Sequence, residues 1–154
     1  AACRTGNWAI AQPMLARLER LPMPAGRGRI LLDLGKSEVE VWQACNVKLV
    51  DPTTKMLIKP EQQAAREVKA RAKALSLCEQ CMTTARRLDD VELVEESAVT
   101  MWNVGRELLT AEYRGKASKS FMRCADILEE VQSVSLAQLR VQLHFEVACS
   151  EIAS

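Results

Sequence analysis

The distribution of proline constrains this chain most strongly. All five prolines lie in the first 60 residues, together with four of the six glycines. The rest of the chain, residues 61–154, holds no proline and only Gly105 and Gly115. Because proline interrupts helices and glycine weakens them, this segment is predicted to form long helices joined by short turns.

Apolar residues in the proline-free segment recur at steps of three and four, which is the spacing of one helix face. The four stripes are Leu75, Cys78, Met82 and Ala85; Val91, Val94, Ala98, Met101, Trp102, Gly105 and Leu108; Ala117, Phe121, Cys124, Leu128 and Val131; and Leu136, Leu139, Leu143 and Val147. The sequence therefore predicts four helices, joined near residues 88, 111 and 134. Connections this short make consecutive helices antiparallel neighbours.

Residues 1–60 are predicted to form an irregular helical segment with proline- and glycine-rich loops. Gly6 and Asn7 precede a helix that continues to about Arg20, and Pro13 either kinks this helix or marks its first turn. Residues 21–28 are expected to be a linker, residues 36–50 a short helix and residues 51–60 a loop. Alternation with a period of two is confined to residues 37–42, so no sheet is predicted.

The fold class expected from these patterns is all-α, with antiparallel helical hairpins stacked as a short tetratricopeptide-like α-solenoid over residues 61–154. Gly105, Ala117, Phe121 and Cys124 have the separations of the tetratricopeptide pattern. Trp102, Gly105, Ala117 and Phe121 are the predicted packing residues, because small residues let helices approach closely and aromatic rings fill the groove between hairpins. The chain begins without a methionine and ends within a helical pattern, so we expect a piece of a longer protein. Such a piece would expose apolar surface at both ends.

A set of residues in the second half of the chain resembles the large cilia- and flagella-associated proteins. The set comprises residues 97–102, Arg106, Leu109, Tyr113, Arg114, Leu128, Leu139, Arg140, Leu143 and Glu146. These proteins are tetratricopeptide-like and build projections of the axonemal central pair. The resemblance implies a non-catalytic scaffold in the cytoskeleton of the cilium or flagellum, with other central-apparatus proteins and microtubules as partners.

Charge is balanced over the whole chain but not along it. Twenty-one Lys and Arg against 20 Asp and Glu give no global reason to expect nucleic acid or an anionic membrane as a partner. Residues 61–88 hold six bases and three acids, whereas residues 89–97 hold five acids and no base. Either the two helices complement each other along a shared edge, or Arg66, Lys69 and Lys73 form a basic ridge that faces an acidic partner such as tubulin.

Three patterns resemble chemical sites, and each lacks a necessary part. Gly35, Lys36 and Ser37 have no glycine at the position that a phosphate-binding loop requires, so a plain loop is expected there. Cys78 and Cys81 have metal-ligand spacing but no second Cys-x-x-Cys pair, and only His144 with Cys149 could complete a zinc site. We expect the six cysteines to be reduced and free of metal.

The sole histidine, His144, lies beside an apolar stripe, and no serine nucleophile motif is present. The sequence therefore predicts no enzyme, no cofactor and no small-molecule substrate. The favoured function is a structural scaffold segment. The alternatives are a soluble tetratricopeptide-like adaptor that captures a peptide in its concave groove and an enzyme of unrecognised type. A clamp of Lys, Arg and Asn across the concave face would favour the adaptor, whereas outer ridges matched to neighbours would favour the scaffold.

Overall fold

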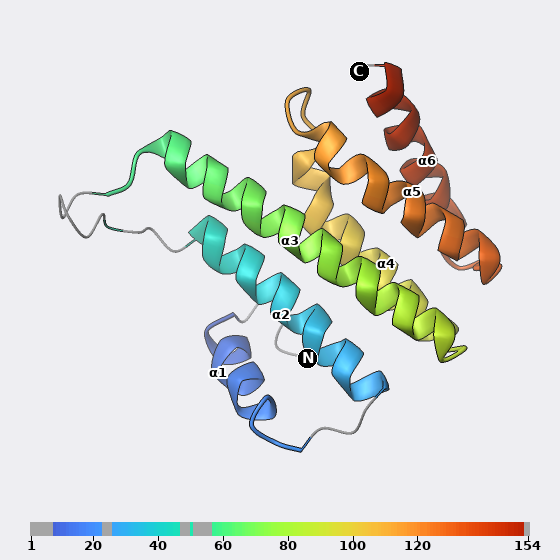
Figure 1. Ribbon diagram of the computed structural model, residues 1–154, viewed down its shortest axis with the longest axis horizontal. Helices are drawn as coiled ribbons and strands as arrows, with labels where there is room; N and C mark the ends of the chain where they lie inside the picture. The colour runs from blue at the N-terminus through green and yellow to red at the C-terminus, as the bar shows by residue number, and fades with distance from the viewer. Residues whose placement is uncertain (1–7, 23–25, 47–49, 51–56, 153–154) are drawn as a thin grey trace.

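The computed structural model describes residues 8–22, 26–46, 50 and 57–152. Within these residues the chain forms six α-helices and one short 3-10 helix (Figure 1). They are α1 (Trp8–Leu18), α2 (Arg27–Asn46), α3 (Pro60–Arg87), α4 (Val91–Gly105), η1 (Arg106–Leu108), α5 (Arg114–Glu130) and α6 (Ala137–Ile152). The described residues contain no β-strand, and Val50 and Leu57 form an isolated antiparallel bridge. The all-helical prediction is confirmed.

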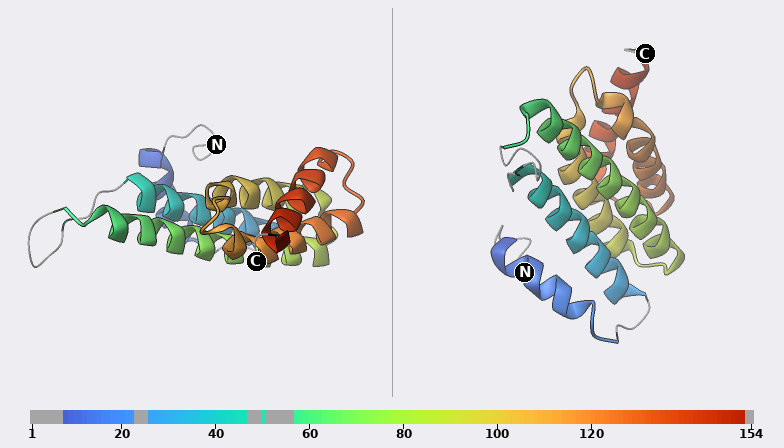
Figure 2. Two further views of the ribbon diagram at one scale, coloured as in Figure 1. Left: turned by 90° about the horizontal axis from the view of Figure 1, so that it is seen from above. Right: turned by 60° about the vertical axis from the view of Figure 1, so that its left-hand side comes forward.

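The helices lie in two layers. α2 and α4 lie beside each other in one layer, and α3 and α5 lie beside each other in the other, so that each helix also contacts its sequence neighbour (Figure 2). α1 packs against α2 at one edge of the array, and α6 packs against α5 at the opposite edge (Figure 1). Each helix from α2 to α5 therefore contacts the next helix, and α2 and α3 also contact the helix after that.

The core forms between the layers from the stripes that the sequence indicates. Its largest fully buried side chains include Leu75, Met82, Met101 and Phe121. The predicted stripe member Val91 is exposed instead, because it occupies the first position of α4 at the edge of the turn.

The turn between α3 and α4 combines a helix C-cap with a helix N-cap. Asp89 has a φ of 55°, and the Asp90 N–H donates to the Ala85 carbonyl at 3.1 Å, as in a Schellman motif. The Asp90 carboxylate then accepts from the Leu93 N–H at 3.0 Å and caps α4.

The turn between α5 and α6 repeats this arrangement 43 positions further along the chain. Gln132 has a φ of 52°, and the Ser133 N–H donates to the Leu128 carbonyl at 3.0 Å. The Ser133 hydroxyl accepts from the Leu136 N–H at 3.3 Å. Two successive hairpins thus share one turn geometry, at a spacing longer than the ~34 residues of a tetratricopeptide repeat and within the ~40–47 residues of longer helical repeats.

The first part of the chain differs from the prediction. Residues 34–37 are the middle of α2 and not a loop, and this helix spans Arg27–Asn46 where a linker to residue 28 and a short helix over 36–50 were expected. The reason is that α2 buries two faces. Ile30, Leu34, Ser37, Val41 and Ala44 share one face, and Leu32 and Val39 are buried on another. A helix that is apolar on two faces does not show a single stripe in its sequence.

In α1, Pro13 lies inside the helix, which runs from Trp8 to Leu18. The predicted cap at Gly6 and Asn7 lies outside the described residues, as do Cys3 and most of the predicted loop over residues 51–60.

Candidate protein-interaction surfaces

The four predicted packing residues lie around the contact between α4 and α5. Gly105, Ala117 and Phe121 are buried, and Trp102 is half-buried with its ring centroid 5.6 Å from that of Phe121. A Cβ atom on Gly105 would lie 2.8 Å from the Phe121 ring and 2.9 Å from a methyl group of Leu75. Gly105 therefore lets the Phe121 ring lie directly against the end of α4.

The predicted basic ridge on α3 is directed toward α2. The Lys73 ammonium lies 2.7 Å from a carboxylate oxygen of Glu40, and the Arg66 guanidinium donates to the Gln43 carbonyl at 3.4 Å. Lys69 is exposed. Two of the three residues thus contact the neighbouring helix, and the Lys73 side chain is still 67% exposed.

The acidic block after α3 has partners that the sequence analysis did not identify. Arg27, at the start of α2, lies 2.5 Å from Asp90 and 2.7 Å from Glu92. Glu95 accepts from the hydroxyls of Ser133, at 2.7 Å, and Ser135. These contacts join distant segments, so no pattern of local charge could have shown them.

The buried thiols have the chemistry of core residues. Cys78 lies 3.6 Å from the Ser37 hydroxyl, and Cys81 lies 3.9 Å from the Ile30 carbonyl. Burial raises the pKa of Cys78 to about 11 and those of Cys81 and Cys124 to about 12, so that these groups are protonated thiols at neutral pH.

The pair that could have completed a zinc site lies on α6, on the far side of α5 from these thiols. His144 is exposed and lies 3.3 Å from a carboxylate oxygen of Glu129, and Cys149 is half-buried. Among the described residues, no group of three or more His, Cys, Asp or Glu side chains is arranged to hold a metal ion.

The Gly-Lys-Ser segment lies within α2, and its Lys and Ser side chains contact other parts of the protein. The Lys36 ammonium lies 2.5 Å from a Glu19 carboxylate oxygen, and the buried Ser37 hydroxyl donates to the Leu34 carbonyl at 2.7 Å. A helix backbone has its amides bonded within the helix, so this segment offers no amide cradle for a phosphate.

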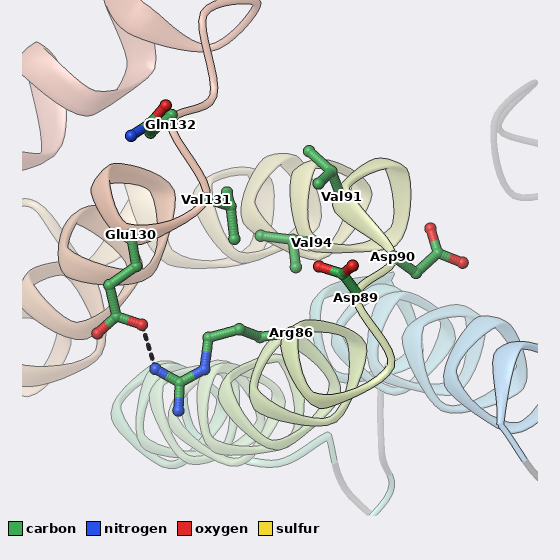
Figure 3. Close-up of a pocket in the computed structure, with 8 residues that line it drawn as sticks. All are labelled: Arg86, Asp89, Asp90, Val91, Val94, Glu130, Val131 and Gln132. Carbon is green, nitrogen blue, oxygen red and sulfur yellow. Dashed lines mark hydrogen bonds and ion pairs between the residues drawn. The ribbon is translucent and has the colours of Figure 1, made fainter.

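One pocket, of about 540 Å³, lies where the two equivalent turns meet (Figure 3). Val94 and Val131 lie between the turns, and Arg86 reaches across to Glu130 in an ion pair that joins α3 to α5 (Figure 3). The Arg86 guanidinium is engaged in this ion pair, so we interpret the pocket as a seam that fixes one hairpin against the next.

An open groove of about 1530 Å³ lies over the layer formed by α2 and α4. Trp8 and Leu15 of α1 line one side, and Ser135 and Leu136 line the other. Trp8 and Trp42 stack within it, with ring centroids 6.1 Å apart. The two tryptophans are 34 positions apart, and the sequence analysis did not identify this contact.

Both edge helices carry exposed apolar stripes. On α6 the exposed stripe consists of Ala137, Val141, Phe145, Ala148 and Ile152, on the face opposite the Leu143 and Val147 side chains that pack toward α5. On α1 the stripe consists of Ile10, Met14 and Leu18. Val141 is 70% exposed and Phe145 is 59% exposed. Side chains of this size seldom line up in water without a partner surface.

No protein-family model, curated protein or solved structure matches this chain. Within the described residues, no helix combines the length and the apolar character that crossing a lipid bilayer requires.

Proposed function

We propose that this chain is a non-catalytic scaffold segment, built as a short α-solenoid of stacked helical hairpins. The repeated turn, the two layers and the contacts of each inner helix with its near neighbours all support this interpretation. The spacing of the two turns favours a hairpin unit somewhat longer than a tetratricopeptide repeat.

The observation that carries the proposal is the exposed apolar stripe on α6. The residues of this stripe are spaced three and four positions apart, as are the apolar residues that the inner helices bury. The stripe on α1 recurs at steps of four residues and lies at the opposite edge of the array. Each stripe is therefore suited to pack against a further helical hairpin, so that the segment is extended at both edges.

The proposed location is the axonemal central apparatus of the cilium or flagellum. This proposal rests on the sequence resemblance over residues 97–154, with cilia- and flagella-associated protein 46 as the member it resembles. Arg114 and Glu146, which belong to the resembling set, lie 3.6 Å apart across α5 and α6, with Glu146 almost fully buried. The proposed partners are other central-apparatus proteins, and microtubules beside them.

The experiment is to express the tagged chain in a ciliated cell and to extract the membranes and soluble matrix with detergent. We expect the chain to stay with the axoneme, and to be lost from axonemes that lack the central pair. A variant with Val141→Gln and Phe145→Gln should be extracted, whereas Met122→Gln, at an exposed apolar residue of α5, should be retained. Extraction of the unmodified chain would contradict the proposal.

The second candidate function is the peptide-binding adaptor, which the groove over α2 and α4 favours. The groove does not have the basic clamp expected of an adaptor for carboxylate groups. The Arg71 guanidinium donates to the Val104 carbonyl at 2.9 Å and to the Cys45 sulfur, and Arg106 pairs with Glu107. An adaptor built on this groove would therefore bind a ligand that is not recognised through its carboxylate groups.

A further inference from the structure

The equivalence of the two hairpin turns extends to the helices on either side of them. A step of 43 positions takes Asp89 to Gln132, and the same step takes the buried stripe of α3 onto that of α5. The α3 stripe is Ala74, Cys78, Cys81 and Ala85, and the α5 stripe is Ala117, Phe121, Cys124 and Leu128. Residues 67–109 and 110–152 therefore form equivalent hairpin units, which share the alanine and the second cysteine of this stripe.

The second helices of the two units differ in how much of their surface is covered. α4 packs against both α3 and α5, whereas α6 packs against α5 at the edge of the array (Figure 1). By the same step, the exposed stripe of α6 corresponds to positions that are buried or half-buried in the first unit. These positions are Val94, Ala98, Trp102, Gly105 and Leu109.

α5 lies along these α4 residues. The Trp102 ring centroid lies 5.6 Å from that of Phe121, and a Cβ atom on Gly105 would lie 2.8 Å from the Phe121 ring. At the other end of the helix pair, Val94 and Val131 line the same pocket (Figure 3). The exposed face of α6 is thus the equivalent of a face that, on α4, is covered by the antiparallel first helix of the next unit.

We propose that the α6 stripe binds the first helix of a further hairpin, in the antiparallel register in which α5 lies on α4. This inference rests on the proposed function and names the kind of helix that the stripe accepts. The stripes of α3 and α5 define that helix. Its apolar residues follow steps of four, three and four, and the first of them is small, as Ala74 and Ala117 are.

One residue of α6 limits the size of the side chain that can lie on it. Ala148 occupies the position of Gly105, where a Cβ would lie 2.8 Å from the Phe121 ring. In the same geometry, a phenylalanine at the second position of the incoming stripe would collide with the Cβ of Ala148. Cys78 of α3 occupies the position equivalent to Phe121 and is fully buried. The incoming helix therefore carries a residue smaller than phenylalanine there, as α3 does.

The test appends one hairpin to the chain in this register. Ile152 is equivalent to Leu109, so a second copy of residues 110–154 is fused directly after Ile152, with Phe121→Cys in the appended copy. Urea unfolding followed by circular dichroism compares the fused chain with the 154-residue chain. We expect the fused chain to unfold in one transition, with its midpoint higher by about 0.5 M or more, because stacked units stabilise each other.

Paired substitutions locate the contact on α6. Val141→Gln with Phe145→Gln changes two exposed side chains of the 154-residue chain, so its midpoint should move little. In the fused chain the appended helix would cover both residues, and the same pair should abolish the gain in midpoint. The control is Val91→Gln with Val99→Gln, at two exposed valines of α4 outside the stripe, which should shift the two chains equally.

A fused chain with no gain in midpoint, or an α6 pair that shifts both chains equally, would overturn the inference. If circular dichroism shows that the fused chain does not fold, a fluorescently labelled peptide of residues 110–132 with Phe121→Cys is titrated into the unmodified chain. Binding that the α6 pair weakens about fivefold or more supports the inference, and no binding or unchanged binding overturns it. Self-association of the 154-residue chain through Val141 and Phe145, without a gain in the fused chain, would refute this occupant and leave the scaffold proposal in place.

Discussion

At the scale of single residues, the contact between Gly105 and Phe121 shows how one missing side chain sets a helix packing distance. The spacing of Gly105, Ala117 and Phe121 in the sequence indicated where small and aromatic residues would meet. It could not indicate that Leu75 would also lie against Gly105, because α3 approaches from a segment 30 positions earlier. The sequence thus predicted where the helices pack closely, but it did not predict that Leu75 takes part in this contact.

Replacing this glycine tests the contact. Gly105→Ala places a Cβ 2.8 Å from the Phe121 ring, so we expect a loss of about 1–3 kcal/mol in the free energy of unfolding. Gly115→Ala is the matched control, because nothing lies within 4 Å of a Cβ at Gly115 and alanine favours the helix by up to ~1 kcal/mol. Urea unfolding followed by circular dichroism measures both. An equal effect of the two substitutions would show that Gly105 is not closely packed.

The thiols provide a second test at this scale. Burial raises the pKa values of Cys78, Cys81 and Cys124 to between about 11 and about 12, so very little thiolate is present at pH 8. In the native protein these three residues should resist alkylation by iodoacetamide, and the half-buried Cys149 should react before them. Mass spectrometry of peptides after timed labelling gives the order. Rapid labelling of Cys78 without denaturant would contradict the described packing.

At the scale of elements, the four helices of residues 61–154 were predictable because each buries one face. α2 was not, because its buried residues lie on two faces and its Gly35 suggested a break. The backbone geometry of the turns also could not be predicted from the sequence. The joins predicted near residues 88 and 134 located the two turns, but the left-handed conformation of Asp89 and Gln132, which makes the turns equivalent, is visible only in the structure.

The α3–α4 turn predicts a particular response to acid. The Leu93 N–H, and then the Arg27 guanidinium, hold the pKa of Asp90 below its ordinary value. Asp90 therefore stabilises the folded state above pH ~4, and this contribution is lost as the pH falls through the lowered pKa. Asp90→Asn keeps a capping side chain but removes the titrating group, so its stability should fall less steeply than that of the unmodified chain between pH 5 and pH 2. Parallel slopes in urea titrations would rule out the role of this carboxylate.

At the scale of the whole molecule, the described helices form two layers, with α1 and α6 at opposite edges. The all-helical class follows from the sequence. The groove could not be predicted, because it brings together α1, α2, α4 and the turn before α6. The stacking of Trp8 on Trp42 likewise depends on where α1 packs. A stacked architecture predicts apolar outer faces on its two edge helices, as found on α1 and α6. The residues of the exposed α6 stripe, however, are not those of the predicted stripe, which faces α5.

The central claim is that the exposed stripe on α6 is a stacking surface, and sedimentation velocity of the 154-residue chain tests it most directly. Exposed apolar surface promotes association at micromolar to millimolar protein concentrations. We predict that the unmodified chain forms larger species as its concentration rises, that Val141→Gln with Phe145→Gln shifts the distribution toward monomer, and that Met122→Gln does not. A chain that stays monomeric over the whole range, or an α6 variant that sediments like the unmodified protein, would contradict the account.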